Sequence, residues 1–109
     1  VNFYAADEAV NEEAEKFLKA YHEKYGENSV PEDAVALGYD SYIIALDAID
    51  RADDDATGEE IRDVLKEERS FQGASGTITF NTTGDPIKTA YISTWRDGEL
   101  VSIYTVDPV

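Results

Sequence analysis

The side chains of this sequence that could take part in catalysis are mostly carboxylates. The 109 residues include 24 Asp and Glu, nine Lys and Arg, a single histidine (His22) and no cysteine. A catalytic nucleophile needs a base held beside it, and no serine lies in a Gly-x-Ser-x-Gly pattern. With so many carboxylates, some pairs will lie close together by chance, so they do not indicate a glycosidase-like site. We therefore predict no enzymatic activity and no catalytic residue.

Motifs for metals and cofactors are missing as well. Asp53-Asp54-Asp55 lacks the alternating ligands, the turn glycine and the distal glutamate of a calcium loop. No glycine-rich stretch forms a phosphate-binding loop that leads into a helix. We predict no metal site and no cofactor. We expect His22 to be a solvated side chain on the polar side of a surface helix.

The formal net charge of −15 limits the partners of the chain. Nucleic-acid affinity depends on Lys and Arg that neutralise phosphates, so a nucleic-acid partner is excluded. Anionic membrane surfaces are disfavoured for the same reason. The acids are spread over the whole sequence, as expected for a solvated acidic surface; a salt-rich habitat would also fit.

The element that organises the chain is an apolar helix predicted over residues 34–52. Its apolar residues recur at helical spacing, and its polar positions are Asp40, Ser41, Asp47, Asp50 and Arg51. A helix that is apolar over most of its circumference is normally covered by neighbours, so we expect other elements to surround it. We expect Asp33 to cap it. Gly38 indicates either a close backbone approach or a break near its start.

Two amphipathic helices are predicted on either side of the central helix. The first runs from the N-cap Asn11 to the C-cap Gly26. The last begins at the capping-box sequence of residues 57–60 and carries Lys66 and Arg69 toward its end.

After residue 70 the apolar period changes to two, which predicts strands over 76–80, 87–95 and 99–106. Asp97-Gly98 is a strong signal for the turn of a hairpin. The sequence therefore predicts three helices over about 7–70 and a β-meander over about 76–106, an α+β arrangement for the isolated chain.

Several short motifs follow one another in a characteristic order. They are Phe17 with Tyr21, Tyr25 and Gly26; Ala36-Leu37-Gly38-Tyr39-Asp40-Ser41; Ala48-Ile49-Asp50-Arg51-Ala52; Ile61 through Leu65; Phe71-Gln72-Gly73 with Gly76; Phe80-Asn81 with Gly84-Asp85; and Trp95 with Gly98. In this order the chain resembles the C-terminal region of type I periplasmic solute-binding proteins. The nearest branch is the branched-chain amino-acid (Leu/Ile/Val) binding family of ABC transporters.

This resemblance implies an α/β fold with two lobes that close on a small ligand. Most of the chain would belong to one lobe, with the final hairpin near the hinge. The implied function is solute binding for an ABC transporter of amino acids, outside the cytoplasm, either in the periplasm or as a lipoprotein. The implied partners are the amino acid, held together with the rest of the parent chain, and an ABC permease. Since the sequence starts in mid-pattern, we expect a mature fragment or an expressed domain.

The resemblance also suggests ligand-binding residues. The position five residues before the tyrosine of the Tyr-Asp motif is often aromatic in the family and packs on the ligand, but it is Ala34 here. A small residue leaves room for a bulkier ligand side chain or moves the contact elsewhere, so the ligand stays open. Tyr39 and Asp40 are the next candidates. Alternatively, Tyr39 packs in the core and Asp40 binds backbone near the start of the helix.

Two further functions remain open at this point. The same fold could serve as the ligand-sensing extracellular domain of a receptor or regulator, or the chain could be an acidic interaction domain without a small ligand. In either transport or sensing, we expect the isolated chain to bind amino acids poorly, because one wall cannot enclose a ligand. Uncovered apolar surface in the fragment would favour self-association.

Overall fold

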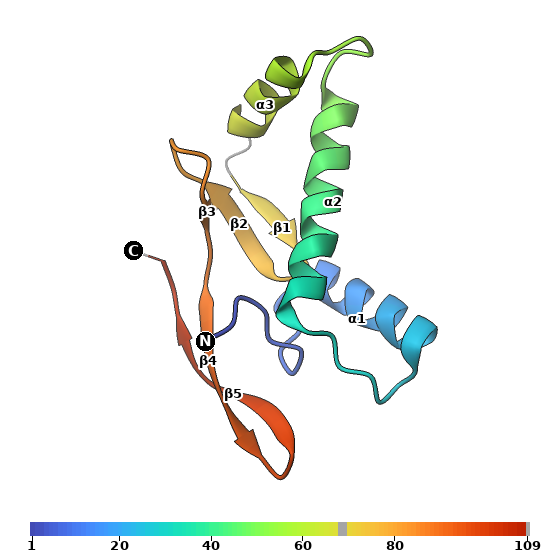
Figure 1. The fold of residues 1–109 in the computed structure, drawn as a ribbon, viewed down its shortest axis with the longest axis vertical. Helices are drawn as coiled ribbons and strands as arrows, with labels where there is room; N and C mark the ends of the chain where they lie inside the picture. Colours follow the sequence, from blue (N-terminus) through green and yellow to red (C-terminus); the bar gives the residue numbers. More distant parts are fainter. Residues whose placement is uncertain (68–69, 109) are drawn as a thin grey trace.

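The chain forms three helices followed by five strands within residues 1–67 and 70–108, which the computed structural model describes (Figure 1). The elements are α1 (Glu12–Tyr25), α2 (Asp33–Arg51), α3 (Gly58–Glu67), β1 (Phe71–Gly73), β2 (Gly76–Phe80), β3 (Pro86–Ile87), β4 (Ala90–Arg96) and β5 (Glu99–Val106). The predicted order of helices and then antiparallel strands is confirmed. Arg69, predicted near the end of the third helix, lies outside the described residues.

The predicted caps of α1 are confirmed. The side chain of Asn11 accepts a hydrogen bond from the backbone N–H of Ala14 (2.8 Å). Gly26 takes the positive φ of 103° that ends the helix, and its N–H donates to the carbonyl of His22. The expectation of a solvated His22 was wrong: its ring is half-buried and its Nε2 lies 3.0 Å from the carbonyl oxygen of Ser29. His22 thus ties the end of α1 to the following loop.

The central helix is confirmed, with two corrections at its start. Glu32 is the N-cap, without a side-chain hydrogen bond, and Asp33 is the first helical residue. The helix is continuous through Gly38, and a Cβ built at Gly38 would meet no described atom within 4 Å. Neither a break nor a close approach therefore explains this glycine within the described residues.

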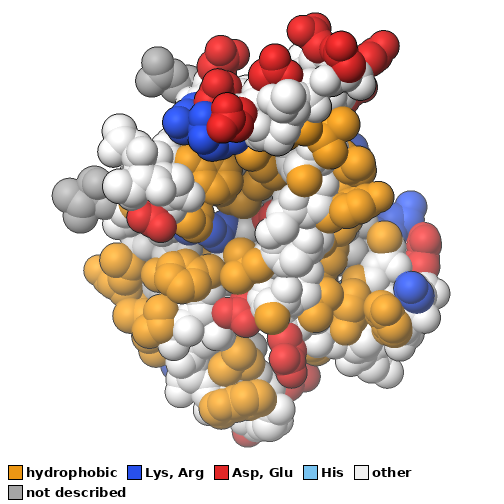
Figure 2. Space-filling model, turned by 45° about the horizontal axis from the view of Figure 1, so that its top comes forward, with side chains coloured by type: hydrophobic (Ala, Val, Ile, Leu, Met, Phe, Trp, Pro, Cys, Tyr) orange, Lys and Arg blue, Asp and Glu red, His pale blue; other side chains and the backbone are white. Residues whose placement is uncertain are grey.

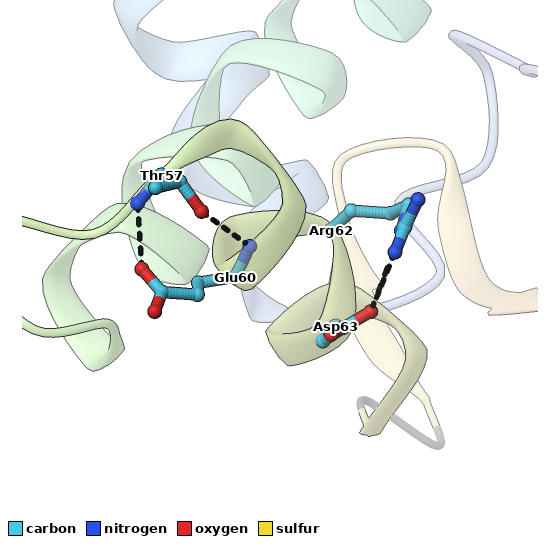
Figure 3. A network of polar contacts seen from close by, with 4 residues as sticks. All are labelled: Thr57, Glu60, Arg62 and Asp63. Carbon is cyan, nitrogen blue, oxygen red and sulfur yellow. Dashed lines mark hydrogen bonds and ion pairs between the residues drawn. The ribbon is translucent and has the colours of Figure 1, made fainter.

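A reciprocal pair of hydrogen bonds starts α3, as the sequence predicts (Figure 3). The backbone N–H of Thr57 donates to Oε2 of Glu60 (2.7 Å), and the backbone N–H of Glu60 donates to Oγ1 of Thr57 (3.3 Å). One turn later, Arg62 donates to Asp63 at 3.2 Å on the exposed surface.

Replacing Thr57 by alanine should cost about 1 kcal/mol of the free energy of unfolding, because one helix donor loses its acceptor. Urea unfolding followed by circular dichroism measures this change. A Thr82→Ala variant, in the β2–β3 loop outside any helix cap, is the control. An unchanged unfolding curve for Thr57→Ala would show that the capping box contributes nothing.

The strands form two separate sheets instead of one continuous meander. In the first, β2 pairs antiparallel with both β1 and β3, in the order β1-β2-β3; β4 and β5 form the second. The predicted strand over 87–95 is interrupted at residues 88–89, and β1 was not predicted at all. The hairpin turn is confirmed: Asp97 and Gly98 both have positive φ, 50° and 80°, the conformation of a type I′ turn.

The N-terminal segment runs beside the second sheet. Asn2 and Tyr91 exchange two backbone hydrogen bonds of 2.9 and 2.7 Å. Further along, the carboxylate of Asp7 accepts from the backbone N–H and the hydroxyl of Ser102, both at 2.9 Å. The start of the chain is therefore held against both strands of the β4–β5 hairpin (Figure 1).

The hydrophobic core is small and lies where α1, α2 and the β1–β2 turn meet. Tyr4, Phe17, Ala36 and Ala74 form its centre, with the rings of Tyr4 and Phe17 edge to face at 5.8 Å. The molecule measures 52 × 35 × 19 Å, and its radius of gyration is 15.5 Å. A compact domain of this length would have about 13 Å. The elements thus spread out from one small core.

Candidate functional site

α2 has two opposite faces with different surroundings. Its buried positions recur every four residues and are Ala36, Asp40, Ile44 and Ala48. On the other side lie exposed apolar residues, here called the α2 stripe: Val35, Tyr42, Leu46 and Ile49. The expected covering of the helix is therefore present on one face only, among the described residues. Figure 2 shows hydrophobic side chains spread over the surface seen in that view.

Asp40 is the most deeply buried charged residue of the described chain, with 1% of its surface exposed. Its Oδ1 accepts from the backbone N–H of Ala74 (2.6 Å), and its Oδ2 accepts from the backbone N–H (2.9 Å) and hydroxyl (2.5 Å) of Ser75. A buried carboxylate needs such donors to replace water. Asp40 thus fixes the β1–β2 turn to the middle of α2, 34 and 35 residues away in sequence.

The backbone approaches Asp40 so closely that a side chain is excluded at Gly73. A Cβ at this position would lie 2.6 Å from Cγ and Oδ2 of Asp40. Its neighbour Gly76 has a positive φ of 105°. The two glycines of the Phe-x-Gly…Gly motif therefore serve different needs: room for a carboxylate at the first, and the backbone conformation of the turn at the second.

Lys88 extends this cluster toward the second sheet. Its Nζ donates to Oγ (2.5 Å) and to the carbonyl oxygen (3.3 Å) of Ser75. Burial lowers the pKa of Lys88, and the nearby charge of Asp40 partly opposes this shift. The ammonium, the hydroxyl and the carboxylate form one row, in which the hydroxyl of Ser75 accepts from Lys88 and donates to Asp40.

Tyr39 lies on the side of α2 that faces α1. Its ring packs on Phe17, with centroids 5.0 Å apart, and its hydroxyl donates to Oε1 of Glu13 at 3.0 Å. Burial first, and then the hydrogen bond to Glu13, raise the pKa of Tyr39. The ring of Tyr4 also packs on Phe17, and burial and the charge of Asp40 raise the pKa of Tyr4 to about 12. The hydroxyl of Tyr4 has no hydrogen-bond partner among the described residues.

Ala34 lies in the first turn of α2 and is exposed. The structure therefore places the three predicted ligand-binding residues in different surroundings: Ala34 at the surface, Tyr39 against α1 and Asp40 beneath the β1–β2 turn. Their side chains do not converge on one cavity of the described chain. A groove of about 730 Å³ lies elsewhere, between α3 and the β2–β3 loop, and none of the three residues lines it.

Ser75 was not predicted as a hydrogen-bond partner of Asp40, and Gly73 and Lys88 were not predicted to lie beside this pair. A signal for them exists in the sequence, because Asp40 is the only charged residue in the four-residue repeat of otherwise apolar positions at 36, 44 and 48. A charge at such a position must find polar partners. Within the described residues no group of three His, Cys, Asp or Glu residues is arranged to hold a metal ion, and no helix there has the length and hydropathy to cross a bilayer.

Comparison with known proteins gives consistent results. The family model described as periplasmic binding protein matches residues 1–99. Among solved structures, a leucine-binding protein from Thermotoga maritima is 36% identical with a TM-score of 0.85, over 98% of this chain and 30% of that protein. The substrate-binding protein of a branched-chain amino-acid transporter from Streptococcus pneumoniae, in complex with isoleucine, is 30% identical with a TM-score of 0.81, over 98% and 29%.

A more distant solved structure shares the fold. It is a solute-binding protein of an ABC transporter from R. palustris in complex with benzoate, 20% identical with a TM-score of 0.82, over 97% of this chain and 29% of that one. No curated protein matches the chain significantly in sequence. The chain spans about 30% of the length of the solved proteins that it matches.

Proposed function

Because the chain belongs to the periplasmic binding protein family, we propose that it forms part of the solute-binding component of an ABC transporter for amino acids. The match of the family model over residues 1–99 carries this proposal. The two solved structures at 36% and 30% identity, described as leucine-binding and isoleucine-bound proteins, make branched-chain amino acids the first ligands to test. The protein would act outside the cytoplasm, free in the periplasm or as a lipoprotein, and deliver its ligand to a permease without breaking a bond.

In this proposal the ligand site is shared between this chain and other parts of a larger protein. The chain spans about 30% of the solved proteins that it matches. The α2 stripe supports this sharing, since Tyr42 is 64% exposed and Ile49 is 53% exposed. A contiguous exposed apolar patch normally marks a surface that packs against another part of a protein. The stripe would pack against the remainder of the same lobe, and the two lobes would close on the ligand by a hinge motion.

Within the shared site, Ala34 is the proposed contact to the ligand side chain, because it is exposed at the first turn of α2. We assign Tyr39 and Asp40 to the same site as the residues that hold the N-terminal half of α2 in place. Tyr39 fixes the helix to α1 through Glu13, and Asp40 fixes it to the β1–β2 turn.

Replacing Ala34 by phenylalanine in the larger protein should raise the dissociation constant for leucine by about tenfold or more, because room for a single methylene is already worth that much in an apolar site. Isothermal titration calorimetry measures the effect. Ala20→Phe, on the exposed side of α1, is the control and should leave the affinity unchanged. Unchanged leucine affinity in Ala34→Phe would remove Ala34 from the site.

The isolated chain should self-associate, because the α2 stripe is uncovered in it and apolar surface is driven to be buried. Sedimentation velocity at increasing concentration should show a rising weight-average mass. Leu46→Lys should return the chain to a monomer, whereas Val30→Lys, which removes an exposed apolar side chain outside the stripe, should not. Equal behaviour of the two variants would show that the stripe is not the contact.

A further inference from the structure

The row formed by Lys88, Ser75 and Asp40 links α2, which pairs with no strand, to the segment that follows the paired strands β2 and β3. Asp40 belongs to α2, Ser75 to the β1–β2 turn, and Lys88 to the two residues between β3 and β4. These two residues lie where the first sheet ends and the second begins. The contact of Lys88 with Ser75 (2.5 Å to Oγ) is therefore a polar link between the α2 side of the molecule and the segment that leads into the hairpin.

The far end of that segment is joined to the N-terminal segment. Tyr91 lies three residues after Lys88, and it exchanges two backbone hydrogen bonds with Asn2. The N-terminal segment and the segment that follows Lys88 are thus joined at Asn2 and Tyr91. Movement of this pair of segments relative to α2 has to stretch or break the contacts of Lys88.

The position of Lys88 is unusual for a cation in so acidic a chain. The sequence offers 24 carboxylates for nine cations, yet this ammonium is half-buried on a serine hydroxyl. Burying an ammonium costs solvation free energy, and a methionine would fill the same space without that cost. In some proteins a buried polar group specifies one arrangement of the elements that it joins.

We propose that Lys88 and Ser75 are positioning residues of the ligand site: together with Asp40 they hold the N-terminal half of α2 to the two segments that Asn2 and Tyr91 join. This inference rests on the proposed function, because the ligand would contact the first turn of the same helix. Lys88 and Ser75 do not touch the ligand. They act by keeping α2 in the orientation that the ligand needs, so that binding does not have to order it.

The test uses the larger protein and its leucine affinity. Lys88→Met and Ser75→Ala should each raise the dissociation constant by about 2- to 30-fold, the usual effect of residues that couple to a site without contacting it. Because the shorter contact of Lys88 is to the hydroxyl of Ser75, the effect of the double variant should be clearly smaller than the sum of the two single effects. Lys66→Met, on exposed α3, is the matched control. Unchanged affinity in Lys88→Met, or additive effects in the double variant, would overturn the proposal.

A second measurement separates this inference from the proposed function, because it needs no ligand. By hydrogen exchange in the native state, Lys88→Met and Ser75→Ala should speed exchange of the amides of Asn2 and Tyr91 at least about threefold, and Lys66→Met should not. If the unchanged protein binds no amino acid but exchange at these amides becomes faster in the variants, the proposed function fails, and the contacts of Lys88 and Ser75 still hold the segments together. If exchange does not become faster, the proposed role of Lys88 and Ser75 is refuted.

Discussion

Replacing Asp40 by alanine should lower the free energy of unfolding of this chain by about 3–5 kcal/mol, the range found when one member of a buried charged network is removed. The carboxylate is the acceptor for the backbone N–H groups of Ala74 and Ser75 and for the hydroxyl of Ser75. Without it, these donors stay buried and unpaired, and each such group is costly. A domain of this size has only about 5–15 kcal/mol of stability in total, so the loss is a large part of it.

Urea unfolding of the Asp40→Ala and Asp40→Asn variants measures this effect. Asn keeps the shape and one acceptor oxygen, so its loss should be smaller than that of Ala but still larger than that of the control. The control is Asp47→Asn on the same helix, where the carboxylate forms an exposed ion pair with Arg51, and the expected loss is below about 1 kcal/mol. Equal losses at positions 40 and 47 would show that the buried contacts of Asp40 do not stabilise the fold.

Replacing Gly73 by alanine should lower the free energy of unfolding by about 2–4 kcal/mol, nearly as much as Asp40→Ala. Here the cause is an added atom, the Cβ of alanine, and not a removed group. The new Cβ would lie 2.6 Å from the carboxylate of Asp40, so either the β1–β2 turn or α2 has to move. Such a move stretches the hydrogen bonds of Asp40, and overpacking alone costs about 1–3 kcal/mol. Thermal unfolding followed by circular dichroism should show a midpoint at least about 10 °C lower.

Gly38 supplies the matched control for this substitution. It lies inside α2, and a Cβ there meets nothing within 4 Å. Gly38→Ala should therefore raise the stability of the isolated chain by about 0.5–1 kcal/mol through helix propensity. Two glycine-to-alanine changes in one chain are thus expected to have opposite signs. A stabilising Gly73→Ala would contradict the close approach of Asp40.

The local features of the fold could be predicted because they are encoded by residues close together in sequence. Asn11 and Gly26 cap α1, and Thr57 with Glu60 starts α3, each through contacts within four residues. The Asp97-Gly98 turn is equally local. These signals fix where elements begin and end.

The features that were missed depend on contacts far apart in sequence. β1 has three residues, too few for a visible alternation, and it exists through its pairing with β2. At the interruption, Lys88 contacts Ser75, which lies 13 residues away. The partners of Asp40 lie 34 and 35 residues away, and no local pattern specifies such a pairing. The family resemblance was predicted from the order of motifs and is confirmed by the match over residues 1–99.

The central claim is that this chain supplies part of an amino-acid site that other parts of a larger protein complete. Thermal unfolding of the larger protein and of the isolated chain, each with and without millimolar leucine, isoleucine and valine, tests it most directly. A ligand at 100 times its dissociation constant adds about 2.7 kcal/mol, which should raise the midpoint of the larger protein by about 4 °C and leave that of the isolated chain unchanged. A shift in the isolated chain, or none in the larger protein, would contradict the claim.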